Sequence, residues 1–165
     1  MHSRILKFVA EEELKDVSDC SIEEILNSWD HLPNGIDYVN DMDPSDLDDE
    51  IDDFINSFLT PSAVFKDLYS YDKTNHKIVF HEGFKKAYFK PKLKELVKLL
   101  QTDDFLTKFS EDWRFVYSLK DVIEESSGLL ILDSDFSCDS VDHFVRNCLK
   151  YDTVYHITHV ADYHF

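Results

Sequence analysis

The chain has 165 residues, of which 43% are hydrophobic and 14% aromatic, with only three glycines and four prolines. This composition is too apolar for a disordered chain and leaves little material for linkers, so we expect a single domain over residues 1–165. The formal net charge of −17 opposes binding to nucleic acid and to anionic lipid and favours a cationic partner.

The charge is unevenly distributed along the chain. Residues 16–65 contain fourteen Asp or Glu and no Lys or Arg, whereas residues 66–120 carry a net charge of +4 and residues 121–165 a net charge of −7. Within the basic middle, the run at residues 84–94 interleaves lysine with Phe and Tyr, which could stack on bases. We favour its interpretation as the solvated face of a helix, and we expect no direct contact with nucleic acid.

No feature of the sequence predicts export or a membrane span. No stretch approaches the roughly 20 apolar residues that a membrane-spanning helix needs, and the N-terminus lacks the apolar core of a secretory signal. Cys20, Cys138 and Cys148 are odd in number and have no C-x-x-C spacing. We therefore expect reduced thiols, no cofactor and a cytoplasmic location.

The first predicted element is a short helix at residues 21–29. Ser21 and Glu24 have the spacing of a capping box, in which each side chain satisfies a backbone N–H of the other residue. Apolar residues recur at helical spacing behind this pair, so one face of the helix should be buried. These residues are Ile22, Ile25, Leu26 and Trp29.

Residues 41–54 carry eight acidic side chains in fourteen positions and allow three interpretations: a calcium loop, a disordered tail or an exposed helix face. A calcium loop that starts at Asp41 would need Gly at its sixth position and Glu at its twelfth, where this chain has Asp46 and Asp52. A disordered tail would have no reason to keep Leu47 and Ile51 at helical spacing. The helix is therefore the favoured interpretation.

We predict that this helix has Asp43 as its N-cap and Pro44 as its first residue, and that it ends at Thr60-Pro61. Its apolar stripe consists of Leu47, Ile51, Phe54, Ile55, Phe58 and Leu59. The carboxylates around the stripe form the candidate partner-binding surface, which consists of Asp46, Asp48, Asp49, Glu50, Asp52 and Asp53.

The middle of the chain contains two further predicted elements and one ambiguous segment. Residues 61–71 fit either a helix or a strand, and residues 75–81 predict a strand. Residues 91–101 predict a helix with a lysine-rich outer face. Its expected inward stripe consists of Leu93, Leu96, Val97 and Leu100.

Residues 111–165 predict a βαβαβ core. The elements are a strand at 113–118, a helix at 118–128, a strand at 129–133, a helix at 137–150 and a strand at 153–160. Two crossover units imply three parallel strands, within a sheet that we expect to be mixed. The predicted fold class is α/β, with an acidic helical part at residues 16–60 on or beside the sheet.

The segment LLILDSDFS, residues 129–137, resembles the hydrophobic strand and D-x-D signature of haloacid-dehalogenase-type phosphotransferases. The resemblance implies that Asp133 is a nucleophile and that Asp133 and Asp135 hold magnesium. The chain departs from this pattern at Phe136 and Ser137, and only thirty residues follow Asp135. We favour a turn in which Asp133 ends the strand and Asp135 or Ser137 starts a helix.

A second candidate cluster lies near the C-terminus, where His156, His159, Asp162 and His164 occur within nine residues. On a strand, His159 points away from the other three side chains. The set has no specific metal-binding spacing, but the carboxyl ends of parallel strands are where α/β folds bind ligands. Asp133, Asp135 and His159 are therefore an alternative metal site.

Two functions of different classes follow from these observations. The favoured one is an acidic inhibitor of the immunity-protein or antitoxin kind, which blocks a basic partner, most readily a nuclease-type toxin, by mimicking the charges of its substrate. The alternative is a small metal-dependent hydrolase, phosphatase or ligand binder that uses Asp133, Asp135 and the C-terminal histidines.

Overall fold

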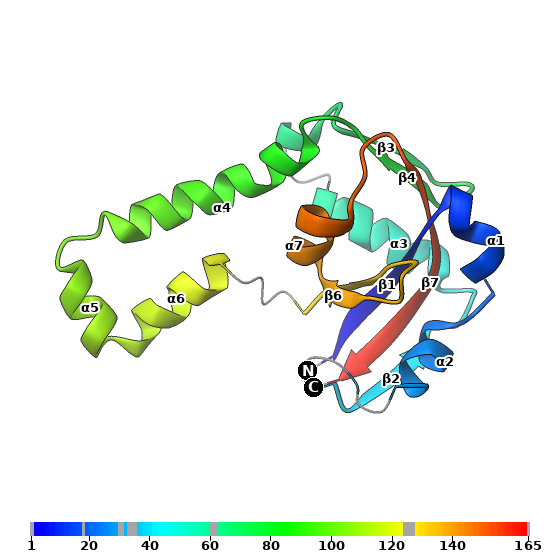
Figure 1. The fold of residues 1–165 in the computed structure, drawn as a ribbon, viewed down its shortest axis with the longest axis horizontal. Helices are drawn as coiled ribbons and strands as arrows, with labels where there is room; N and C mark the ends of the chain where they lie inside the picture. Colours follow the sequence, from blue (N-terminus) through cyan, green and yellow to red (C-terminus); the bar gives the residue numbers. More distant parts are fainter. Residues whose placement is uncertain are drawn as a thin grey trace.

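The fold is a mixed α/β arrangement around one open sheet, from which a helical arm projects (Figure 1). The computed structural model describes residues 2–17, 19–29, 32, 36–59, 63–123 and 128–164. The strands are β1 (His2–Ala10), β2 (Tyr38–Asp41), β3 (Tyr69–Asp72), β4 (Lys77–Phe80), β5 (Leu130–Leu132), β6 (Cys138–Ser140) and β7 (Val154–His164).

The helices vary widely in length. They are α1 (Leu14–Val17), α2 (Ile22–Asn27), α3 (Leu47–Phe54), α4 (Phe84–Leu100), α5 (Phe105–Glu111), α6 (Trp113–Ile123) and α7 (Val141–His143). Two 3₁₀ turns, η1 (Glu11–Glu13) and η4 (Ala63–Phe65), and two π-helical segments, η3 (Ile55–Leu59) and η5 (Phe144–Cys148), complete the described elements.

The sheet has the strand order β3-β4-β7-β1-β5-β6, and β2 pairs with the C-terminal half of β7. Only the pair β1 and β5 is parallel, and the other described pairs are antiparallel. A β-bulge shifts the β1–β7 register between Lys7 and Phe8. Both faces of the sheet are covered, and this produces two apolar cores.

Alternation along the central strands sends side chains into each core. Leu6, Phe8 and Ile157 face α3, the base of α4 and α7 in the larger core. Ile5 and Ala161 face α2 in the smaller core. A strand that is buried on both faces usually has a continuous apolar sequence, and the middle of β1 has this pattern except at Lys7, which is buried and donates a hydrogen bond to the Val17 carbonyl.

The capping box of α2 is confirmed. The Ser21 hydroxyl accepts a hydrogen bond from the Glu24 backbone N–H at 3.1 Å, and the Glu24 carboxylate accepts one from the Ser21 backbone N–H at 3.2 Å. Asp41 of β2 adds a second cap, since its carboxylate accepts from the N–H groups of Ile22 and Glu23. The helix thus begins where its sequence predicts.

The predicted βαβαβ core is not found. Residues 113–118, predicted as a strand, form the first part of helix α6, whereas the helix predicted from residue 118 is confirmed as far as Ile123. Phe115 and Leu119 at helical spacing pack inward, and Phe115 contacts Phe105 of α5 at a ring-centroid distance of 5.5 Å. The predicted parallel arrangement of the strands at 129–133 and 153–160 is also wrong. Strand β7 is antiparallel to β1, and β5 pairs with the opposite edge of β1. Strand β6 occupies the start of the predicted 137–150 helix.

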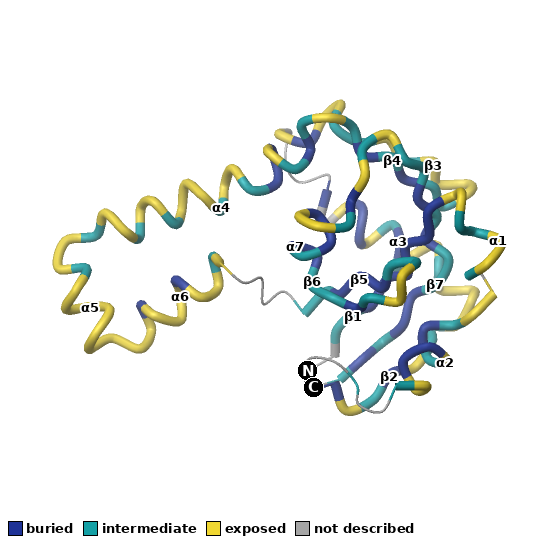
Figure 2. The backbone as a smooth tube through the Cα atoms, in the orientation of Figure 1, coloured by how far each residue is buried: buried dark blue, intermediate teal, exposed yellow. Residues whose placement is uncertain are grey.

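Helices α4, α5 and α6 form the arm, residues 84–123, which extends away from the sheet (Figures 1 and 2). The helix predicted at 91–101 is confirmed and starts earlier, at Phe84. Its predicted inward stripe is wrong, however, because Leu93, Val97 and Leu100 are 60%, 43% and 52% exposed. The amphipathic pattern is present, but most of this stripe meets solvent.

Candidate functional site

The candidate site is on helix α3. The apolar face of this helix packs in the larger core, and its acidic surface is the candidate binding surface. Ile51 is completely buried and Phe54 is 7% exposed, and the π-helical segment η3 continues the buried stripe through Ile55 and Leu59. The side chain of Phe58, the remaining predicted stripe residue, lies outside the described set. Because one face of α3 is buried in the core, the carboxylates lie on its other side.

Helix α3 begins three residues later than its sequence predicts. The Asp43 carboxylate accepts hydrogen bonds from the backbone N–H and the hydroxyl of Ser45, at 2.8 and 2.7 Å. These bonds hold the pKa of Asp43 below its usual value. The short polar side chain thus closes a turn before the helix, and Asp46 occupies the N-cap position in place of Asp43.

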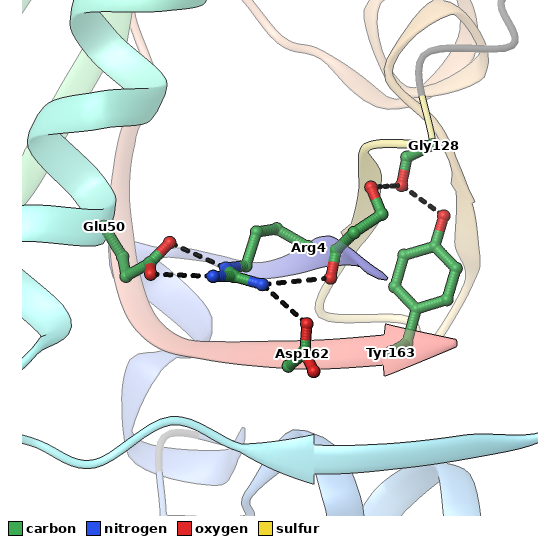
Figure 3. Close-up of polar contacts among 6 residues, drawn as sticks. Arg4, Glu50, Gly128, Asp162 and Tyr163 are labelled. Carbon is green, nitrogen blue, oxygen red and sulfur yellow. Dashed lines mark hydrogen bonds and ion pairs between the residues drawn. The ribbon is translucent and has the colours of Figure 1, made fainter. Parts of the chain in front are cut away.

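Arg4 of β1 fixes α3 to the sheet (Figure 3). Its guanidinium donates two hydrogen bonds to the Glu50 carboxylate, at 2.7 and 2.9 Å, and a third to Asp162 of β7 at 2.6 Å. The hydrogen bond to Glu50 is the main reason that the pKa of Arg4 is raised. A bidentate pair of this kind fixes the relative orientation of the guanidinium and the carboxylate and also strengthens their attraction.

The turn between β3 and β4 places two further basic groups beside α3. Lys73 forms an ion pair with Asp52, which raises the pKa of the lysine, and the His76 Nε2 lies 2.8 Å from the Asp48 carboxylate. The Asp72 carboxylate shapes this turn, since it accepts from the backbone N–H groups of residues 74 and 75. Part of the acidic surface is therefore engaged within the chain itself.

The six predicted partner-binding carboxylates consequently divide into two groups. Glu50 and Asp52 are half-buried and contact Arg4 and Lys73. The other four, which are Asp46, Asp48, Asp49 and Asp53, are exposed, although Asp48 also contacts His76. The sequence gives no sign of this division, because Arg4 comes from β1 and Lys73 from the β3–β4 turn.

Asp133 and Asp135 lie in the turn that joins β5 to β6. The Asp133 carboxylate accepts hydrogen bonds from the backbone N–H groups of Asp135 and Ser137, at 3.1 and 2.9 Å. Asp133 therefore ends its strand as predicted, but the turn leads into strand β6, where we predicted the start of a helix.

A hollow of about 190 Å³ lies beside this turn, where the parallel strands β1 and β5 end. Glu13, Asp133, Asp135 and Cys148 contribute to its wall. Burial, followed by the hydrogen bond to Asp133, raises the pKa of Cys148 to about 11. The thiol is thus protonated at neutral pH and is a poor nucleophile.

His159 lies apart from the two aspartates. His159 is on β7, where its register partner is Lys7 of β1. Strand β1 lies between β7 and β5, and the two aspartates follow β5. Burial, followed by the charge of Lys7, lowers the pKa of His159, which favours the neutral imidazole. Among the described residues, no group of three His, Cys, Asp or Glu side chains could hold a metal ion.

The other residues of the C-terminal cluster also have separate neighbours. His164 lies 3.0 Å from the Asp37 carboxylate, Asp162 binds Arg4, and the His156 Nε2 lies 3.7 Å from Glu11. Alternation along β7 and the bulge distribute these side chains over both faces of the sheet. The described part of the chain therefore does not bring the cluster together.

Comparisons with protein-family models, with curated protein sequences and with solved structures find no match to this chain. Among the described helices, none has both the length and the apolar character needed to cross a membrane. The site must therefore be interpreted from its own geometry and charge.

Proposed function

We propose that the protein is an acidic inhibitor of the immunity-protein or antitoxin kind, which binds and blocks a basic partner through the exposed carboxylates of α3. A nuclease-type toxin domain is the favoured partner, because its active site must be cationic to bind a polyanionic substrate. The observation that carries the proposal is the bidentate contact between Arg4 and Glu50, which anchors the acidic helix to the central sheet.

Rigidity matters because a carboxylate that is already in place costs little entropy when the partner binds. The exposed groups Asp46, Asp48, Asp49 and Asp53 lie on a helix whose other face is packed in the core. An acidic surface of this kind steers a basic partner during diffusion and competes with phosphate groups for the same cations. The expected interaction is fast and sensitive to salt.

The test uses a charge-reversal variant with a matched control. The variant carries Asp46→Lys, Asp49→Lys and Asp53→Lys. The control carries Asp103→Lys, Glu111→Lys and Asp121→Lys, at exposed positions of the arm, so that both proteins have the same net charge. Basic proteins that the wild-type chain captures from cells of its source are purified, and their binding is measured by biolayer interferometry.

We expect the association rate of the α3 variant to fall at least about tenfold, and that of the control to stay within about twofold of wild type. The wild-type rate should also fall steeply between about 50 and about 500 mM salt. Equal binding of both variants would remove α3 as the contact surface. Magnesium-dependent phosphatase turnover that is lost in Asp133→Asn would instead support the hydrolase alternative.

A further inference from the structure

The arm carries most of the exposed large apolar side chains among the described residues. Eleven large apolar side chains are exposed in the described residues, and nine of them lie on α4, α5 and α6. Leu106 and Trp113 are 79% and 71% exposed. Figure 2 shows the contrast between this arm and the largely buried strands of the sheet. Apolar surface concentrated in this way is typical of sites that bind other macromolecules.

A pocket of about 290 Å³ lies between α4, the end of α6 and η5, and we call it the arm pocket. Its apolar wall consists of Phe89, Leu93, Leu96, Val122 and Ile123. Sites for drug-sized molecules usually have volumes of roughly 300–1,000 Å³, so this pocket suits anchoring side chains better than a whole cofactor.

The polar side of the arm pocket carries a positive charge. Asp142 is 4% exposed and accepts hydrogen bonds from Tyr88 at 2.6 Å and from Lys92 at 2.5 Å, so the charge of Lys92 is balanced locally. Arg146, which lines the pocket, lies over the ring of Phe89 at 5.0 Å. Lys85 lies just outside the lining, with its Nζ 3.4 Å from the Arg146 carbonyl. Among the described residues, neither Arg146 nor Lys85 forms an ion pair with a carboxylate.

Helix α4 extends this positive surface along the arm. It contains six lysines and one glutamate, in a protein whose net charge is −17. The side of the molecule that carries the arm pocket therefore attracts a partner of the opposite charge from the one that the α3 carboxylates attract. Charge complementarity and the apolar wall together define the chemistry of the occupant.

We propose that the arm pocket binds an acidic amphipathic segment of another protein, whose apolar side chains enter between α4 and α6 and whose carboxylates meet Arg146 and Lys85. Helices that lie in apolar grooves bind in this way, through anchors at positions i, i+3, i+4 and i+7. This site is separate from the α3 surface and gives the molecule two docking surfaces of opposite charge.

A nucleic-acid ligand fits this pocket less well, because the wall is largely aliphatic and the rest of the molecule repels phosphate. A membrane surface also fits less well. Residues 101–123, which contain α5 and α6, carry five acidic and three basic side chains among the exposed apolar residues. Helices that bind anionic membranes have a strongly basic polar face.

The experiment is a selection from a phage-displayed library of random 16-residue peptides on the immobilised full chain. Leu93→Glu introduces a charge into the pocket wall, and Leu106→Glu makes the same change on the arm outside the pocket. Both leucines are exposed, so circular dichroism should confirm that both variants fold. Arg146→Glu, with Arg114→Glu as its control, tests the charge.

We expect the enriched peptides to carry a net negative charge and regularly spaced apolar residues, and their binding to weaken at least about tenfold in Leu93→Glu and Arg146→Glu but not in the two controls. The reversal variant of α3 should select the same peptides, which separates this proposal from the proposed inhibitor function. No enrichment, enrichment of basic peptides, or equal loss in Leu93→Glu and Leu106→Glu would overturn the proposal.

Two further measurements identify a different occupant. A dimer that is seen by sedimentation velocity and lost in Leu93→Glu would assign the pocket to a second copy of the chain. Co-sedimentation with vesicles that contain phosphatidylserine, abolished by Leu93→Glu, would assign it to a lipid surface. Either result would replace the acidic segment as the ligand.

Discussion

Arg4 of β1 and Glu50 of α3 are 46 residues apart in the sequence, and the guanidinium of one donates two hydrogen bonds to the carboxylate of the other. Because Arg4 also contacts Asp162 of β7, a single cation joins two neighbouring strands to the acidic helix. Glu50 therefore holds α3 in place, whereas Asp46, Asp49 and Asp53 of the same segment are exposed to a partner.

The first prediction concerns the strength of this contact. In a double-mutant cycle of Arg4→Met and Glu50→Gln, we expect a coupling free energy of about 1 kcal/mol, because the pair is bidentate but remains partly in solvent. Urea denaturation provides the measurement. Asp53→Asn, at an exposed carboxylate of the same helix, is the control and should show no coupling with Arg4→Met. A coupling of zero for the first pair would show that Glu50 does not anchor α3.

Local signals in the sequence were sufficient for the elements that depend on local bonds. Ser21 and Glu24 predict the capping box of α2 because both hydrogen bonds join residues three apart. The stripe through Ile51 and Phe54 predicts α3 for a similar reason, since helical spacing alone places these side chains on one face. The exact start of α3 was missed, because the side chain of Asp43 closes a turn instead of capping the helix.

Features that depend on distant parts of the chain were not predictable in this way. Residues 113–118 are rich in aromatic and β-branched side chains and suggest a strand, but packing against α4 and α5 makes them helical. Leu93 and Val97 have the spacing of a buried helix face. No local feature of the sequence shows that this part of α4 extends away from the sheet and leaves both side chains exposed. The division of the acidic site depends in the same way on Arg4 and Lys73, which are distant from α3 in the sequence.

The second prediction concerns Gly128, which has a φ of +71° and lies beside β1 (Figure 3). A Cβ added there would lie 2.8 Å from the Ser3 hydroxyl, which donates a hydrogen bond to the Gly128 carbonyl. We expect Gly128→Ala to lower the free energy of unfolding by about 2 kcal/mol, through backbone strain and this clash.

Gly83 provides the control for that measurement. Its φ is also positive, at +97°, but an added Cβ would meet only Leu68, at an ordinary distance of 3.5 Å. Gly83→Ala should therefore cost about 1 kcal/mol, which is the backbone contribution alone. If urea denaturation gave equal losses for both variants, the close approach of Gly128 to Ser3 would make no separate contribution.

The third prediction concerns the reactivity of the three thiols. Cys20 is exposed, whereas burial raises the pKa of Cys138 to about 12 and that of Cys148 to about 11. Because the thiolate is the reactive form, a disulfide reagent at about pH 8 should modify Cys20 quickly and the other two only slowly or after unfolding. Cys20→Ser should remove the fast phase, and a fast phase that persists would contradict this assignment.

The fourth prediction concerns Tyr71 at alkaline pH. Its hydroxyl oxygen is buried and has no hydrogen-bond partner among the described residues, and burial, with the charges of Asp52, Asp48 and Asp72, raises its pKa to about 12. The unfolded chain should release this proton near pH 10, so the folded state binds more protons between about pH 10 and about pH 12. The free energy of unfolding therefore falls as the pH rises through this interval, because the folded state disfavours the phenolate of Tyr71 and the unfolded chain does not.

Tyr71→Phe removes this titration without removing the ring. At neutral pH we expect little change or a small gain in stability, because the lost hydroxyl has no hydrogen bond within the described structure. Between about pH 9 and about pH 12 the variant should lose less stability than wild type, by an amount on the order of 1 kcal/mol. Urea denaturation across this range gives the comparison. Tyr117→Phe, on the exposed surface of α6, should follow the wild-type profile. Parallel profiles for wild type and Tyr71→Phe would show that the Tyr71 hydroxyl titrates in the folded protein as it does in the unfolded chain.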